Sequence, residues 1–135
     1  MKVENALYPA AEQIEALRND PSLKPVVMLN LLKFRTRAQY PDGRKTDLTG
    51  AQAYGLYAEA MRKIVEREGG KFLFAGDVKY LPVGHVETAW DVVGLVEYPS
   101  PAAFVRIATS LEVAEIDVHH AAGLEGQLLI CVSPR

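Results

Sequence analysis

Asn30 is the first side chain in the sequence whose type and setting could do chemistry. It interrupts the apolar run from Val26 to Phe34. A buried amide without a hydrogen-bond partner costs about 1–3 kcal/mol, so Asn30 must find one. Two roles stay open: a structural amide that holds neighbouring backbone, or a ligand-binding group that orients a carbonyl or stabilises oxyanion charge in a pocket.

Tyrosines supply the second candidate chemistry. Tyr54 and Tyr57 are three residues apart, which places them on neighbouring parts of one helix surface. A phenol at the edge of a pocket can donate a hydrogen bond or a proton, whereas core packing with the hydroxyl at the rim is the alternative. We take Tyr54 as a candidate ligand-binding residue. Tyr98 stands beside Pro99 at the end of a predicted strand, and its role stays open.

Trp90 and Asp91 are consecutive in a predicted strand and therefore point to opposite faces of the sheet. Trp90 is expected to be a wall of the core or of a pocket rather than a redox participant, and it joins the candidate ligand-binding residues. Asp91 would be a general base if it were desolvated. A surface or interface ion pair is the equally open alternative for Asp91.

Three histidines complete the reactive side chains. His85 follows a turn at Pro82-Val83-Gly84, as a solvated loop residue or as a ligand-binding group. His119 and His120 are adjacent and would diverge by about 100° on a helix, so one metal ion cannot use both. Their roles stay open, and no metal site is expected. The candidate ligand-binding residues are thus Asn30, Tyr54, His85 and Trp90, with no catalytic residue assigned.

Cofactor motifs are missing from the sequence. It has no GxGxxG or P-loop pattern for a nucleotide and no nucleophile elbow, so we expect no cofactor. Cys131 is the one cysteine, which excludes a disulfide within the chain and a cysteine-rich zinc site. It lies in the apolar run Leu128–Val132, which predicts a buried thiol.

Length and composition limit the class of protein. The 135 residues are expected to form a single domain, residues 1–135. With 49% hydrophobic and 24% charged residues, the chain has the composition of a folded globular protein. A net charge of −2 offers no basic surplus, so no nucleic acid is expected as a partner. No apolar run approaches the roughly 18 residues of a membrane span, and no signal peptide is evident, so we expect a cytoplasmic protein that does not contact membranes.

The elements that must position these residues follow from hydrophobic periodicity and from turn and cap signals. The first helix is expected at 10–18, and the second runs from a capping box at Thr49–Gln52 to Gly69-Gly70. A third helix is expected from Ser100-Pro101 to Ala108, and a short fourth helix begins after Ser110 and ends at Gly123. The strands are expected at 26–34, 72–80, 88–98 and 127–133. Between the first strand and the long helix, residues 35–48 are expected to be mobile or ordered only by a partner subunit.

This order predicts an α+β fold, a ferredoxin-like β-α-β-β-α-β sandwich with an extra N-terminal helix. Its helices would cover one face of a four-stranded antiparallel sheet. The strands at 26–34 and 88–98 carry apolar residues on both faces, so the other face would be an exposed apolar patch. A second copy packed face to face would cover it, which predicts a homodimer.

Four blocks of the sequence resemble the DUF1330 family. They are VVMLNLLKF (26–34), AYGLYAEAMRKIVEREGGKFLFAG (53–76), WDVVGLVEYPSPAAF (90–104) and AAGLEGQLLI (121–130). The chain departs from the family pattern at Val113, where the family tends to carry a tyrosine, and at His120, where it favours an arginine. The resemblance implies the dimeric α/β-barrel superfamily, in which two ferredoxin-like subunits pair. This family has no established activity.

Two classes of function therefore remain for the chain. One is an uncharacterised small-molecule-binding α/β-barrel protein, which could be a cofactor-independent enzyme of the oxygenase, isomerase or lyase type acting on a small organic substrate. A pocket between the sheet and the helices, lined by apolar groups with Asn30, Tyr54 and His85, would serve it. The other is a non-catalytic ligand-binding or structural homodimer. Converging acid and base groups would favour the enzyme, and a filled core would favour the second class.

Overall fold

A four-stranded antiparallel sheet forms the base of the molecule in the computed structural model, which describes residues 1–135. The strand order is β2-β3-β1-β4. The strands are β1 (Val26–Phe34), β2 (Lys71–Asp77), β3 (Val92–Tyr98) and β4 (Leu124–Val132). The helices are α1 (Ala11–Arg18), α2 (Gly50–Arg67), α3 (Pro101–Ala108) and α4 (Leu111–Gly123).

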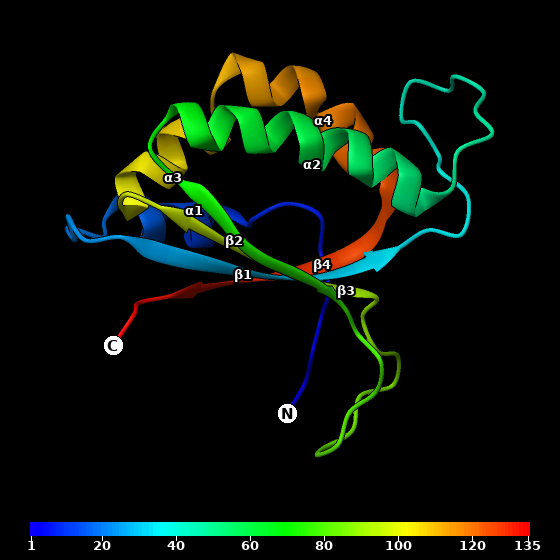
Figure 1. Ribbon diagram of the computed structural model, residues 1–135, viewed down its shortest axis with the longest axis horizontal. Helices are drawn as coiled ribbons and strands as arrows, with labels where there is room; N and C mark the ends of the chain where they lie inside the picture. The colour runs from blue at the N-terminus through cyan, green and yellow to red at the C-terminus, as the bar shows by residue number, and fades with distance from the viewer.

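The helices lie on one side of this sheet. Figure 1 shows α2 and α4 side by side above the strands, with the N-terminus and the connection between β2 and β3 on the opposite side. The predicted α+β, ferredoxin-like class with an added N-terminal helix is confirmed. The sheet is open at β2 and β4 and does not close into a barrel within one chain. None of the helices combines the length and the apolar character that a membrane crossing requires.

Local capping signals explain where the main helices begin. At α2 the Thr49 hydroxyl accepts a hydrogen bond from the Gln52 amide nitrogen at 3.1 Å, and the Gln52 side-chain oxygen accepts one from Thr49 N at 2.9 Å. This is the predicted capping box, in which two free N–H groups are satisfied reciprocally. Ser100 caps α3 through Ala103 N, with Pro101 in the first turn. Each predicted start is confirmed.

The end of β2 and the starts of β3 and β4 differ from the prediction. β2 ends at Asp77 and β3 begins only at Val92, because residues 78–91 leave the sheet as a long connection. Trp90 and Asp91 consequently precede β3 rather than alternating within it. The last strand starts at Leu124, directly after α4. The prediction of a buried Cys131 is wrong: this residue is exposed near the free end of β4, where no helix covers it.

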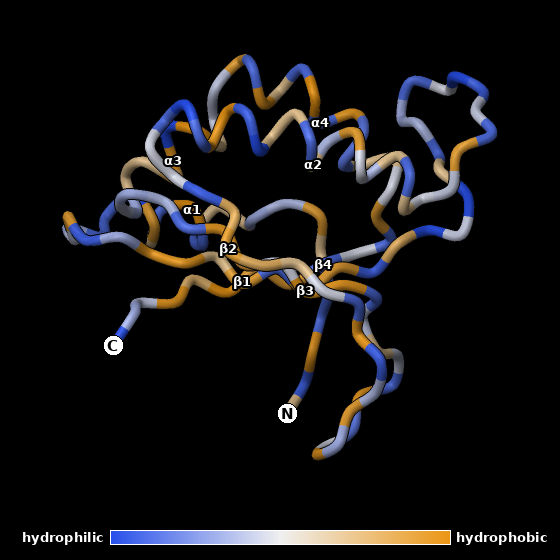
Figure 2. The backbone as a smooth tube through the Cα atoms, viewed as in Figure 1, coloured by the Kyte–Doolittle hydropathy of each residue, from blue (hydrophilic) through white to orange (hydrophobic).

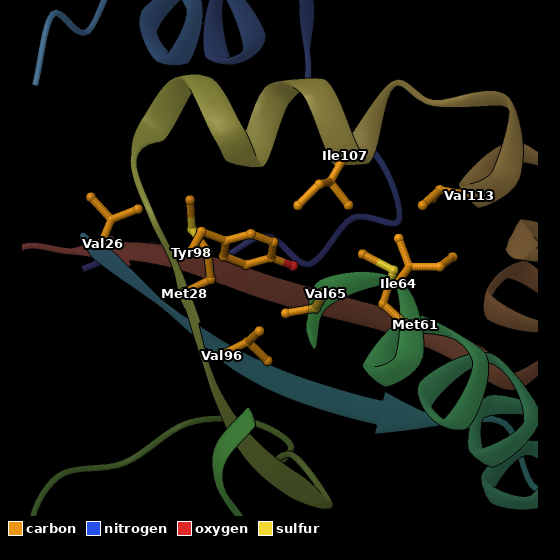
Figure 3. Close-up of a cluster of buried hydrophobic side chains, with 9 residues drawn as sticks. All are labelled: Val26, Met28, Met61, Ile64, Val65, Val96, Tyr98, Ile107 and Val113. Carbon is orange, nitrogen blue, oxygen red and sulfur yellow. The ribbon is translucent and has the colours of Figure 1, made fainter. Parts of the chain in front are cut away.

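The core lies between the sheet and the helices. Figure 3 shows side chains from β1, β3 and α2 converging there with Ile107 of α3 and Val113 of α4. Met28 and Val65 are almost completely buried, with exposures of 1% and 0%. Burial of side chains of this size stabilises the fold by roughly 1.5–3 kcal/mol each. This packing fixes the distance between α2 and the sheet at the α3 end of the molecule.

The connection 35–48 is attached to α4 of its own chain. Gln39 N donates a hydrogen bond to the Ala122 carbonyl oxygen at 3.0 Å, and Ala38 N donates one to Leu48 O at 3.0 Å. Ala38 and Tyr40 are buried. Residues 38–40 thus have hydrogen-bond partners within one chain, which argues against ordering by a partner subunit alone. The mobility of residues 41–47 stays a prediction.

Apolar residues also follow the face of the sheet that no helix covers. Figure 2 shows hydrophobic residues following one another along β1. Because Met28 packs into the helix-side core, its neighbours Val27, Leu29 and Leu31 point to the open face. Leu29 pairs with Leu95 of β3 and with Ile130 of β4, which is 45% exposed. We call this surface the open face; it comprises Val27, Leu29, Leu31, Val93, Leu95, Leu128, Ile130 and Val132.

Candidate functional site

A cavity of about 530 Å³ lies between the sheet and the helices, next to the core. It is lined by 28 residues, of which 20 are hydrophobic. Small residues leave this space unfilled: Gly94 of β3 stands opposite Asn30 of β1, and Ala58 of α2 faces the same cavity. A Cβ atom added at Gly94 would have no heavy atom nearer than the Asn30 Cβ at 3.8 Å. The cavity volume falls within the usual range for small-molecule sites.

Three tyrosine side chains line this cavity. Tyr54 and Tyr57 come from α2, and Tyr98 comes from the end of β3, where Figure 3 shows its ring among the core side chains. Hydrogen bonds of tyrosine hydroxyls in the chain involve only Tyr8 and Tyr40, so these three have no partner. Burial, with a smaller contribution from neighbouring phenols, raises the pKa of all three well above the ordinary value. They are neutral hydroxyls that can donate hydrogen bonds at physiological pH.

Aromatic rings form one wall of the cavity. The ring centroids of Tyr54 and Tyr57 are 5.5 Å apart, and Tyr57 lies 5.0 Å from the His120 ring of α4. Phe34 of β1 extends the wall at 5.6 Å from Tyr54. These separations are typical of favourable tilted contacts between rings. The wall offers apolar contact from several rings that are tilted by 46–55° to one another.

A chain of polar contacts runs along the side of the cavity near α4. The Tyr8 hydroxyl donates to Asp117 Oδ2 at 2.6 Å, and Asp117 Oδ1 lies 3.3 Å from His120 Nδ1. His120 Nε2 lies 2.8 Å from Gln127 Oε1 of β4. His120 is only 6% exposed, and both of its ring nitrogens face protein groups. His120 therefore contacts Gln127 through Nε2, while its buried Nδ1 lies beside Asp117 without a hydrogen bond.

Titration behaviour follows from these contacts. Burial would raise the pKa of Asp117, but the contacts with His120 and Tyr8 outweigh it and hold this pKa below the ordinary value. Burial, the hydrogen bond to Asp117 and its negative charge raise the pKa of Tyr8 to about 12. Around neutral pH the pair is thus a carboxylate that accepts from a neutral phenol.

Residues 5–9 bring Tyr8 to this position, and we call them the N-terminal strap. Ala6 and Gln127 exchange two backbone hydrogen bonds of 3.0 and 2.9 Å along the outer edge of β4. Trp90 Nε1 donates to Asn5 Oδ1 at 2.8 Å. Leu7, Tyr8 and Pro9 then line the cavity. The strap covers the cavity at the β4 edge.

The four candidate ligand-binding residues of the sequence do not come together. Asn30 and Tyr54 line the cavity. His85 lies in the exposed connection between β2 and β3, and Trp90 holds the strap from outside the cavity. The Asn30 Nδ2 atom donates long hydrogen bonds to the carbonyl oxygens of Met28 (3.3 Å) and Gly94 (3.4 Å). Its Oδ1 atom has no partner in the chain.

The residues whose roles were open now have defined surroundings. Asp91 accepts a hydrogen bond from Phe34 N at 2.8 Å and pairs with Lys33 Nζ at 3.3 Å, so it joins the end of β1 to the start of β3. Of the two roles left open for Asp91, a general base or an ion pair, the structure shows the ion pair. His119 Nδ1 lies 2.7 Å from the Tyr40 hydroxyl, outside the cavity. No three His, Cys, Asp or Glu side chains are grouped so as to hold a metal ion.

Asp117, Tyr8 and Gln127 are the cavity residues that sequence reasoning missed. Asp117 and His120 are three positions apart in the sequence, and on a helix this spacing could have predicted that the two side chains are neighbours. The position of Tyr8 beside the cavity could not be predicted from the sequence, because the path of the N-terminal strap depends on its pairing with β4. Gln127 was placed at the start of a strand, without a reason to face a histidine.

Comparison with solved structures identifies relatives of the chain. A methylated form of the RPA0582 protein is 37% identical, with a TM-score of 0.88 over 97% of this chain and 96% of that one. The chain belongs to the RPA0582 family. A second structure in this family, described as a protein of unknown function from Rhodopseudomonas palustris, is 34% identical, with a TM-score of 0.87 over 98% of each chain.

A more distant structure was also found outside the RPA0582 family. It is described as a dimeric protein of unknown function with a ferredoxin-like fold from Bacteroides fragilis. It is 12% identical, with a TM-score of 0.46 over 82% of this chain and 96% of that one. No family model matches the sequence. No curated protein is significantly similar to it either.

Proposed function

We propose that this member of the RPA0582 family binds a small, mainly apolar organic molecule in the cavity between the sheet and the helices. The observation that carries the proposal is the set of three phenol hydroxyls, on Tyr54, Tyr57 and Tyr98, that line an apolar cavity without a hydrogen-bond partner. These hydroxyls are accessible from the cavity rather than sealed in the protein interior, so a molecule there can accept their hydrogen bonds. A bound molecule would supply the missing partner.

Asn30 and Tyr54 are the sequence candidates that we assign to this ligand. Asn30 keeps a free Oδ1 atom and makes only long hydrogen bonds through Nδ2. Its position opposite Gly94 leaves room beside the amide. Tyr54 offers a neutral hydroxyl and one face of the aromatic wall.

Thermal denaturation with naphthalene, which has no polar group, tests the cavity itself. We expect naphthalene to raise the Tm of the wild-type protein, because a ligand that binds only the folded state stabilises it. Ala58→Phe fills the cavity and should abolish this shift while the protein stays folded. Ala102→Phe, the same change at an exposed position of α3, is the control and should keep the shift. No shift in the wild-type protein would contradict the proposal.

A cofactor-independent enzyme of the oxygenase, isomerase or lyase type is the second candidate function. The contacts among Tyr8, Asp117 and His120 favour it, because a carboxylate held by a phenol and an imidazole lies beside the same cavity. Groups of this kind transfer protons in catalysis. Mass spectrometry of a bound molecule before and after incubation would separate the two functions: conversion supports an enzyme, and recovery unchanged supports a binding protein.

A homodimer is the assembly that we infer for the protein. The open face carries apolar side chains from β1, β3 and β4, including Ile130 and Val132 of β4 with exposures of 45% and 38%. A second copy packed on this face would complete a dimeric α/β barrel from two open sheets. A purely structural homodimer remains the alternative if the cavity binds nothing.

We also propose that the chain is a member of the DUF1330 family and that it is located in the cytoplasm. The four resembling blocks correspond to β1, most of α2 with β2, β3 with the start of α3, and the end of α4 with most of β4. They therefore include the elements that enclose the cavity. A chain with a single cysteine and no disulfide suits a reducing compartment. Cell fractionation would test the location, and an alignment of RPA0582 relatives with DUF1330 members would test the family.

A further inference from the structure

The charges around the cavity restrict the ligands that it can hold. No Lys or Arg is among the 28 lining residues. The carboxylates among them are Asp77 and Asp117, and the imidazole is His120. A ligand carboxylate or phosphate would enter without a cationic partner, and burial of an unpaired charge is strongly unfavourable. The cavity therefore disfavours anions.

Cations also lack a suitable partner in the cavity. Asp117 already accepts the Tyr8 hydrogen bond and faces His120 Nδ1 at 3.3 Å. Asp77 is exposed at the end of β2 and lies in water rather than in the interior. The burial that raises the pKa of Tyr54 and Tyr57 shows that this region opposes a new charge.

Three hydrogen-bond donors remain free in the cavity, beside the free acceptor Oδ1 of Asn30. The hydroxyls of Tyr54, Tyr57 and Tyr98 have no acceptor in the chain. An uncharged carbonyl or ether oxygen accepts such bonds without bringing a charge into the cavity. The rings of Phe34, Tyr54 and Tyr57, tilted by 46° between neighbours, can contact the face or edge of an aromatic ring placed beside these hydroxyls.

We propose that the ligand is an uncharged aromatic molecule with an oxygen acceptor, such as an aryl ketone, whose oxygen accepts hydrogen bonds from the cavity tyrosines. This inference rests on the proposed function, because it names the class of molecule that the same cavity binds. The aromatic rings provide the contact area, and the phenols fix the orientation of the ligand.

A series of naphthalene derivatives that differ in charge tests the inference. Dissociation constants are measured at neutral pH for 2-acetylnaphthalene, 2-naphthoate and 2-naphthylmethylammonium, with naphthalene as the reference skeleton. We expect the ketone to bind at least about tenfold more tightly than either ion, because neither ion finds a free group of opposite charge inside the cavity. Equal or tighter binding of an ion overturns the inference, while naphthalene binding keeps the proposed function. Failure of all four compounds overturns both.

Removal of single hydroxyls tests the assignment to the tyrosines. Tyr54→Phe and Tyr57→Phe should each weaken 2-acetylnaphthalene binding by about fivefold, the usual worth of one neutral hydrogen bond. Naphthalene binding should not change in either variant, which shows that the cavity is intact. Tyr80→Phe, at a tyrosine that is 73% exposed outside the cavity, is the matched control. A ketone affinity that is unchanged in both cavity variants overturns the assignment.

Discussion

Asn30 shows how a single residue can be predicted to matter while its role stays open. Its amide in an apolar strand indicated either a structural bond or a ligand contact. The hydrogen bonds of 3.3 and 3.4 Å to Met28 and Gly94 are too long to hold the fold strongly. We therefore expect Asn30→Leu to cost no more than about 1 kcal/mol of stability. The increase in the free energy of unfolding that the ligand causes should be lost in the same variant.

The measurement for Asn30→Leu is denaturant unfolding of the variant and of the wild-type protein, each with and without 2-acetylnaphthalene. Loss of several kcal/mol without ligand would show that Asn30 holds the fold through protein hydrogen bonds. Unchanged ligand stabilisation would show that the amide does not contact the ligand.

Asp117 should make the stability of the protein depend on pH in the acid range. Its pKa is held below the ordinary value of 3.8 in the folded state. The folded state thus favours the carboxylate, so its contribution is present above about pH 3.8 and is lost as the pH falls through the lowered pKa. Because the side chain is 33% exposed, the effect should stay below about 1 kcal/mol.

Asp117→Asn should remove this part of the pH dependence. The free energy of unfolding is measured from pH 2 to 6, a range of about two units on either side of the usual carboxylate pKa. We expect a flatter profile for the variant than for the wild-type protein below pH 3.8. Glu12→Gln, on the exposed face of α1, is the control and should leave the profile unchanged. Identical profiles for Asp117→Asn and wild-type protein would refute the argument.

The candidate site could be predicted in part from residue types. Asn30 and Tyr54 stood out because a polar or aromatic group in a periodic element has a definite face. His85 and Trp90 could not be placed, because the connection of residues 78–91 follows no repeating pattern. Tyr8 reaches Asp117 across 109 positions of sequence, a contact that depends on tertiary pairing alone.

Among the elements, the start of α2 lies tightly against neighbouring backbone at Gly50. A Cβ atom added to Gly50 would come closest to the Arg35 carbonyl oxygen and would also lie 2.7 Å from the Gly123 carbonyl oxygen at the end of α4. Backbone atoms cannot move aside as a flexible side chain can. We expect Gly50→Ala to destabilise the protein by about 1–3 kcal/mol, the usual cost of overpacking.

Gly55 of the same helix gives the matched comparison for this substitution. A Cβ atom added there would meet no heavy atom within 4 Å. Alanine lowers the entropy of the unfolded chain and favours the helix, so Gly55→Ala should stabilise by about 0.5–1 kcal/mol. Denaturant unfolding of both variants checks the contrast. Effects of equal sign would show that the backbone of Arg35 and Gly123 does not constrain Gly50.

The elements were predictable where local chemistry decides them. Thr49 with Gln52, and Ser100 with Pro101, contain their capping signals within a few residues. The strand ends were not predictable in this way. Val78 and Tyr80 continue the alternation of β2, yet the chain leaves the sheet at Asp77 because pairing with β3 ends at Val92. Pairing partners rather than local preference set that limit.

At the scale of the whole molecule, the order of elements was sufficient to predict the topology. The sandwich with strand order β2-β3-β1-β4 is the compact arrangement that this order favours. The cavity was only predicted as a general region, because its volume depends on which facing residues are small. Gly94 opposite Asn30 is such a pair, and strand register brings it together.

The open face supplies the prediction that concerns the whole molecule. Leu29, Leu95 and Ile130 stand next to one another across three strands on a surface that no helix covers. At roughly 25 cal/mol per Å² of apolar surface, burial of such a face against a second copy is favourable. Light scattering with size-exclusion chromatography at micromolar concentration should give twice the chain mass of 14.9 kDa.

Ile130→Asp should shift this assembly toward a mass of 14.9 kDa, because the interface would have to bury a carboxylate without a partner. Leu111→Asp is the control: it introduces the same group at a residue of α4 that is 84% exposed on the helix side. Circular dichroism shows whether each variant keeps its fold, so that loss of the dimer is separated from unfolding. A wild-type mass of 14.9 kDa would exclude the dimer. A dimer that survives Ile130→Asp would place the interface on another surface.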